Sequence, residues 1–160
     1  MKPAIIGVFI LLLLTPNYGM SQDSTDVKKD YASYGLQASF VSGIGISYGR
    51  VFDQRTRTRI TGGILTTQNT TQFSVGGDLQ FFLTRGNEFN VFVGPSVGSF
   101  GETGTTPKPR IAFSTGFERP VTGRTIYNNI SAGVVLYYPT YYIQSNTIGV
   151  AAGVFIYYNY

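Results

Sequence analysis

The sequence predicts an all-β fold, namely an eight-stranded antiparallel up-and-down transmembrane β-barrel. From Tyr31 onward, apolar residues alternate with small or polar ones at a period of two, and no helical period is found. About eight such segments follow one another, each close to the length of a tilted strand that crosses a bilayer. The face opposite the apolar one carries mostly Gly, Ser, Thr, Gln and Ala. Small residues suit the crowded interior of a small barrel, whereas a water-facing surface would be rich in Lys and Glu.

The segment before the barrel is typical of a secretory signal peptide. Lys2 precedes the apolar run Ala4–Leu14, and Gly19 and Ser21 supply small side chains before an expected cleavage ahead of Gln22. A transmembrane anchor is the alternative, but the run is too short to span a bilayer. The predicted domains are therefore a signal peptide (1–21), a polar periplasmic tether (22–30) and an outer-membrane β-barrel (31–160).

The strands are predicted in order from the alternation. They cover residues 34–41, 44–50, 58–65, 71–83, 89–99, 110–118, 126–138 and 147–160. The fourth is the clearest, because Phe73, Val75 and Leu79 alternate with polar residues that include Asp78. On this basis Val75→Arg or Val134→Arg should be costly in a bilayer and the inward Gly76→Ser mild.

The connections divide into two sets, one at each end of the predicted barrel. With the N-terminus in the periplasm, the periplasmic joins are short, at residues 53–56, 84–88 and 119–123. The external joins are expected at 42–43, 67–70, 100–109 and 139–146. The two longest joins lie on the external side, as is typical of outer-membrane barrels.

With these features, the chain resembles the small outer-membrane β-barrel proteins of the OmpX type and the OmpA transmembrane domain. The resemblance is one of pattern over nearly the whole mature chain. It implies an integral protein of the Gram-negative outer membrane with both termini in the periplasm, surrounded by outer-membrane lipids. It also implies that the last strand carries the signal read by the barrel-assembly machinery, at Ile156, Tyr158 and Tyr160.

Composition argues against several classes of function. The chain contains neither histidine nor cysteine, so it lacks the base that barrel-type lipid hydrolases and acyl transferases use, and no cofactor or metal site is predicted. Ser114 and Glu118 share the inward face, but a serine without an adjacent base is ordinarily a small filler. The net charge of +4 is spread over turns, which argues against a nucleic-acid surface. We therefore expect a protein that is not an enzyme.

Charges predicted inside the barrel bear on whether it conducts. These lumenal charges are Arg59, Asp78, Arg110 and Glu118. Arg59 and Asp78 lie about equally far from a short loop, so we expect a cross-strand ion pair. Hydrated charges, or an Arg59–Glu118 pair, are the alternatives. Two functions remain open: a structural or interaction barrel, including an accessory subunit of a secretion, assembly or conjugation complex, and a narrow porin-like passive channel along the lumenal glycines.

Two further regions are candidates for contact with partners. Tyr141, Tyr142 and Ile143 form a candidate external binding loop, with an interfacial aromatic girdle as the alternative. Arginines are expected near the periplasmic turns, where they would meet lipid headgroups or a periplasmic or outer-membrane protein partner. They are Arg50, Arg55, Arg57, Arg85, Arg119 and Arg124.

Overall fold

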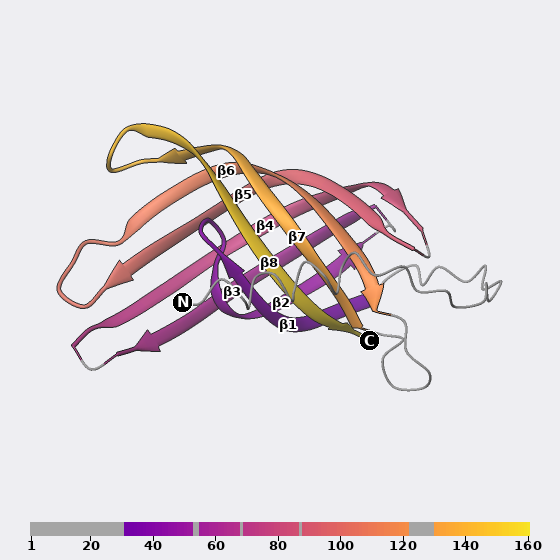
Figure 1. Cartoon of the computed structure of the whole chain (residues 1–160), viewed down its shortest axis with the longest axis horizontal. Coiled ribbons are helices and arrows are strands. Elements are labelled where there is room, and N and C mark those ends of the chain that lie inside the picture. Colours follow the sequence, from indigo (N-terminus) through magenta and orange to yellow (C-terminus); the bar gives the residue numbers. More distant parts are fainter. Residues whose placement is uncertain (1–30, 53–54, 68, 87, 122–129) are drawn as a thin grey trace, which may run out of the picture.

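The chain folds into one closed barrel of eight antiparallel strands joined in chain order (Figure 1). This computed structural model describes residues 31–52, 55–67, 69–86, 88–121 and 130–160, so the predicted signal peptide and tether lie outside the described residues. The strands are β1 (Tyr31–Ser39), β2 (Gly43–Phe52), β3 (Thr56–Thr66), β4 (Thr71–Arg85), β5 (Asn90–Glu102), β6 (Lys108–Val121), β7 (Ile130–Tyr142) and β8 (Thr147–Asn159). β8 pairs with β1 and closes the barrel. The predicted all-β, eight-stranded antiparallel barrel is confirmed.

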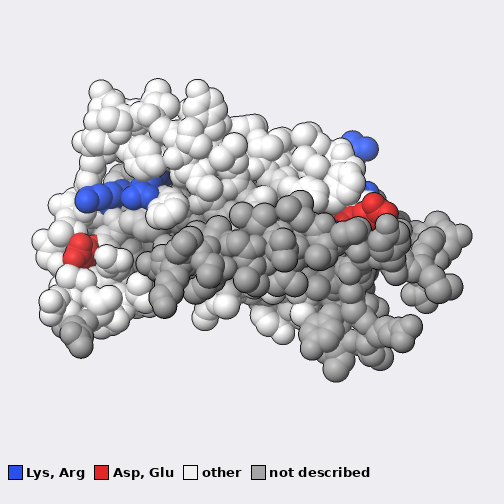
Figure 2. Space-filling model, viewed as in Figure 1, with Lys and Arg blue, Asp and Glu red and all other residues white. Residues whose placement is uncertain are grey.

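The two faces of each strand follow the predicted alternation. Val75 is 53% exposed on the outer face of β4, while Asp78 on its inner face is 4% exposed. The same division holds in β8, where Val150 and Ile156 point outward and Phe155 and Tyr157 point inward. Figure 2 shows charged side chains gathered toward the two ends of the visible face, with uncharged residues between them. The barrel is therefore apolar outside and polar, with some large aromatic side chains, inside.

The barrel has a terminal end, where β1 begins and β8 ends, and a loop end opposite to it. The two longest predicted connections at the loop end are shorter in the structure. Backbone pairing continues through Phe100↔Lys108 and Tyr142↔Thr147, so only residues 103–107 and 143–146 separate these strands. Pro139 does not end β7, because the register shifts between Tyr137 and Thr140 and a bulge accommodates the missing N–H. At the other end β6 extends to Val121, and the predicted start of the seventh strand lies outside the described residues.

The turn between β1 and β2 folds into the barrel. β1 and β2 are the shortest strands, at 9 and 10 residues, and their turn ends well short of the other loop-end hairpins (Figure 1, indigo). Val41 and Ser42 in this turn are fully buried. A Cβ added to Gly98 would lie 1.8 Å from the Val41 carbonyl oxygen, and one added to Gly76 would lie 2.4 Å from that of Ser42. β4 and β5 can seat the turn only because these two residues are glycines, so the expectation of a mild Gly76→Ser effect is wrong.

Within the described residues, no helix has the length and apolar character that crossing a membrane requires. In the same part of the chain, no group of three or more acidic, histidine or cysteine side chains is placed to hold a metal ion.

Candidate functional site in the barrel interior

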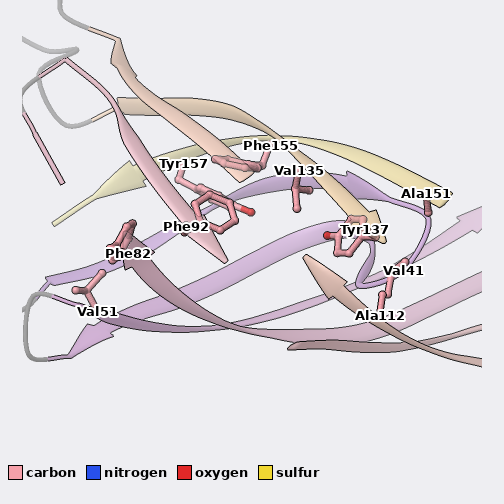
Figure 3. Packing of buried hydrophobic residues seen from close by; sticks show 10 residues of the cluster. All are labelled: Val41, Val51, Phe82, Phe92, Ala112, Val135, Tyr137, Ala151, Phe155 and Tyr157. Atoms are coloured by element: carbon pink, nitrogen blue, oxygen red, sulfur yellow. The ribbon is translucent and has the colours of Figure 1, made fainter. Parts of the chain in front are cut away.

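Large aromatic side chains pack together in the interior (Figure 3), and several of them lie opposite glycines in the strand register. Phe92 lies directly across from Gly116 in the β5–β6 register, and Phe155 lies across from Gly133 in the β7–β8 register. A Cβ on either glycine would come within 2.0 Å and 2.4 Å of the opposing ring. Tyr157 and Gly35 form a third such pair between β8 and β1. These three glycines therefore leave room for the aromatic rings that lie opposite them.

A buried ion pair crosses the interior between β3 and β6. Arg57 Nη1 lies 2.6 Å from Glu118 Oε2, and both side chains are buried. Glu118 Oε1 also accepts a hydrogen bond from Asn90 Nδ2 at 3.3 Å. Arg57 Nε donates to Gln80 Oε1 at 2.8 Å, and its guanidinium lies 4.9 Å from the centre of the Phe82 ring. Each charge thus has an opposite charge and at least one further hydrogen bond, as a buried charge requires.

Arg57 lies next to the β2–β3 turn as predicted, but it does not face lipid headgroups or a partner. Its side chain points into the barrel beside that of Arg59 and is among the largest fully buried groups. The sequence could have predicted this orientation, because residues 57 and 59 share one face of an extended strand and Arg59 was expected to point inward. Sequence reasoning missed it by grouping the arginines according to their distance from a turn.

Arg59 and Asp78 face each other as predicted, but a third side chain connects them. They are register partners in the β3–β4 ladder. Arg59 Nη1 donates to Gln37 Oε1 at 3.2 Å, and Gln37 Nε2 donates to Asp78 Oδ2 at 3.5 Å. Glu118 pairs with Arg57 and not with Arg59. The direct ion pair that we expected is replaced by this bridge, and the Arg59 guanidinium instead lies 4.2 Å from the centre of the Tyr157 ring.

Gln37 is the centre of the polar network, and the sequence analysis assigned it no role. Its Oε1 also accepts from Thr61 Oγ1 at 3.3 Å and from the Tyr157 hydroxyl. Its Nε2 reaches the Tyr137 hydroxyl at 3.4 Å and Ser42 in the β1–β2 turn. Gln37 therefore joins β1 to β3, β4, β7 and β8. The alternation of side chains along β1 predicts that Gln37 points into the lumen, but it does not predict that side chains from all these strands meet there.

Arg110 lies at the loop-end mouth rather than deep in the lumen. It is partly exposed, donates to the Phe40 carbonyl of the β1–β2 turn, and stacks over Phe100 (4.4 Å) and Tyr142 (5.1 Å). Of the four predicted lumenal charges, Arg59, Asp78 and Glu118 are buried in the interior. Arg110 instead holds the inserted turn at the rim.

The candidate external loop is mostly strand. Tyr141 and Tyr142 belong to β7, and only Ile143 falls in the connection to β8. Tyr142 lies over Arg110, whereas Tyr141 is exposed and its hydroxyl donates to Asn146 Oδ1. The prediction that these residues form one binding loop is wrong, because strand pairing continues past Pro139.

The remaining predicted residues take the following positions. Ile156, Tyr158 and Tyr160 share the outer face at the terminal end, and Tyr34 packs against Tyr158 and Tyr160 at ring distances of 5.5 Å and 5.7 Å. Ser114 is buried and donates to the Gly94 carbonyl at 2.8 Å. Its hydroxyl is thus engaged with backbone, while Glu118, the carboxylate on the inner face of the same strand, is held by Arg57.

No family model matches this sequence, and no curated protein is significantly similar to it. The barrel combines an apolar exterior with an interior that holds aromatic side chains and a network of buried charges.

Proposed function

We propose that this protein is an integral outer-membrane β-barrel with a structural or interaction role, a closed lumen and no enzymatic activity. The observation that carries the proposal is the distribution of side chains between the two faces. Every strand presents an exposed large apolar residue outward, among them Leu36, Ile46, Ile60, Val75, Val97, Ile111, Leu136 and Val150. Soluble proteins rarely expose a continuous apolar surface of this extent, whereas lipid is its natural solvent.

The interior supports the same proposal from the opposite side. A soluble barrel places its apolar residues inside, but here the interior holds Arg57, Arg59, Asp78 and Glu118. Burying such charges is costly unless each is paired or hydrogen-bonded. The paired charges and the apolar exterior together favour a barrel that faces lipid.

A packed interior favours a structural or interaction role over a passive channel. Phe92, Phe155 and Tyr157 fill the middle of the lumen, and Val41 and Ser42 close its loop end. An accessory subunit of a secretion, assembly or conjugation complex is one form of this role. Pull-down without crosslinking tests that form, because an accessory subunit should retain partners through purification.

Membrane fractionation and gel mobility test the location. The protein should appear in the outer-membrane fraction and migrate faster unheated than boiled, because a folded barrel survives in detergent. Recovery of the folded protein in the soluble periplasm would contradict the proposal.

Planar-bilayer recordings test the closed lumen. The wild-type protein should give no single-channel steps, since side chains occupy the path. Regular steps would favour the passive channel instead.

A further inference from the structure

A hollow lies on the outer surface of the barrel at its terminal end. It is lined by Tyr31, Ala32, Tyr48, Arg50 and Tyr160. Ala32 pairs with Arg50 in the β1–β2 register, and its backbone exchanges two hydrogen bonds with Tyr160 (3.1 Å and 2.9 Å). Ala32, a small residue, therefore lies between the long side chains of Tyr160 and Arg50 in one row across the strands. The hollow exists because the Ala32 methyl group fills little of the space between these two side chains.

Tyrosines form the wall of this hollow toward the middle of the barrel. Tyr34 pairs with Tyr48 on one side and with Tyr158 on the other. Tyr34 and Tyr160 are also in ring contact at 5.7 Å. Tyrosine hydroxyls at this height can donate hydrogen bonds, while the rings face the apolar surface.

Arg50 faces outward and is held by no acidic partner among the described residues. Its guanidinium lies 5.3 Å from the centre of the Phe52 ring, and the structure pairs it with no carboxylate in those ranges. Arg57, on the inner face of the neighbouring strand, is by contrast fully paired with Glu118. Within the described residues no carboxylate engages the Arg50 guanidinium, whose N–H groups are therefore suited to an external acceptor.

The order of side chains along β2 matches the order of groups in a phospholipid. From the end of β2 toward the middle of the barrel, the outward residues are Phe52, Arg50, Tyr48, Ile46 and Ile44, and Ile46 is 72% exposed. Below Phe52 at the rim, a cation is therefore followed by an aromatic ring with a polar tip and then by aliphatic surface. Phosphate, glycerol ester and acyl chain succeed one another in the same direction.

We propose that this hollow binds the phosphodiester headgroup of a phospholipid. Arg50 donates to the phosphate oxygens, for which a guanidinium is well suited. The hydroxyls of Tyr48 and Tyr160 are hydrogen-bonded to each other, and the remaining O–H of this pair donates from the flank. The acyl chains lie along Ile46 and Leu36. This inference rests on the proposed membrane location, because the acyl chains need a lipid-facing surface.

Native mass spectrometry of the full chain in detergent tests the site with three probes. These are phosphatidylglycerol, a diacylglycerol of the same acyl chains, and inorganic phosphate. The wild-type protein should retain phosphatidylglycerol and neither of the other two, because the site recognises a phosphate joined to acyl chains. Arg50→Gln should weaken phosphatidylglycerol binding roughly tenfold, as expected for the loss of a charge-assisted contact.

Two matched variants separate the hollow from its charge. Arg55→Gln removes an exposed arginine from the β2–β3 connection at the same end and should leave binding unchanged. Ala32→Leu keeps Arg50 but fills the floor, and should weaken binding as Arg50→Gln does. Equal losses in Arg50→Gln and Arg55→Gln would overturn the site in favour of general charge attraction, as would unchanged binding in Arg50→Gln. Retention of inorganic phosphate alone would overturn the lipid as ligand.

Vesicle flotation distinguishes failure of this inference from failure of the proposed function. Protein that floats with vesicles but shows no preference for phosphatidylglycerol over diacylglycerol overturns the headgroup site alone. Protein that stays soluble overturns both.

Discussion

The outer and inner faces of the same strands differ in whether their side chains need specific partners. On β4, Val75 and Leu83 point outward and are exposed, with no specific partner needed beyond an apolar solvent. Asp78 and Gln80 on the inner face are buried, and each meets a particular side chain from another strand. In the proposed function, the outer face matches the barrel to a lipid environment. The inner face specifies how the barrel is closed and packed.

The largest effect should come from the inner face, on removing one partner of the buried ion pair. Glu118→Ala leaves Arg57 charged and buried, and should lower the free energy of unfolding by about 3–5 kcal/mol. Urea unfolding of the refolded protein measures the loss. Glu88→Ala, at an exposed position between β4 and β5, is the control and should change little. A loss for Glu118→Ala no larger than that of an exposed pair, about 1 kcal/mol or less, would show that the pair is dispensable.

The next largest effect should come from placing a charge on the outer face. Val75→Arg or Val134→Arg should cost about 2–4 kcal/mol if the position lies near the bilayer midplane. Folding into vesicles of defined composition, followed by denaturant titration, measures this cost. Ser96→Ala on the inner face is the mild control, since Ser96 is small and its hydroxyl has no hydrogen-bond partner. Tolerance of arginine at both outer positions would refute a lipid-facing surface there.

A smaller effect should follow from crowding the seat of the β1–β2 turn. Gly98→Ala puts a methyl group against the Val41 carbonyl and should cost about 1–3 kcal/mol through overpacking. Gly62→Ala is the matched control, because its nearest neighbour would be the Ser74 carbonyl at 3.7 Å, an ordinary contact. Thermal unfolding of both variants measures the difference. If the two glycines behaved alike, the turn would not be seated on β5 as described.

The smallest effect concerns the bridged pair Arg59 and Asp78. Because Gln37 lies between them, a double-mutant cycle of Arg59→Gln and Asp78→Asn should give a coupling of about 0.5–1 kcal/mol. Urea unfolding of the two single variants and the double variant gives the coupling. Strictly additive losses would mean that Gln37 transmits nothing between the two charges.

Local pattern predicted the faces and the near-neighbour pairing of the barrel. The period of two placed Val75 outside and Asp78 inside, and the short β3–β4 loop set Arg59 opposite Asp78. These properties depend on one strand or on one hairpin, so a stretch of sequence contains them. The length of β7 was less accessible, because a bulge lets the strand continue through Pro139.

Contacts across the lumen could not be predicted in the same way. Gln37 meets Asp78 and Tyr137, and Arg57 meets Glu118, from strands that are not neighbours in the pairing order. The alternation of side chains along each strand predicts only that these residues all point into the interior. Which of them meet depends on strand tilt, on stagger and on the inward fold of the β1–β2 turn, and no single segment contains that information.

The seating of the β1–β2 turn also constrains the order of assembly. Ser42 meets the Tyr137 hydroxyl at 2.8 Å across 95 residues of sequence, and Gln37 meets Tyr157 across 120. The hairpin that emerges first from synthesis therefore completes its contacts only after β7 and β8 have arrived. Folding of this barrel is dominated by non-local contacts, which makes it intrinsically slow and leaves the N-terminal hairpin unprotected until the final strand is in place.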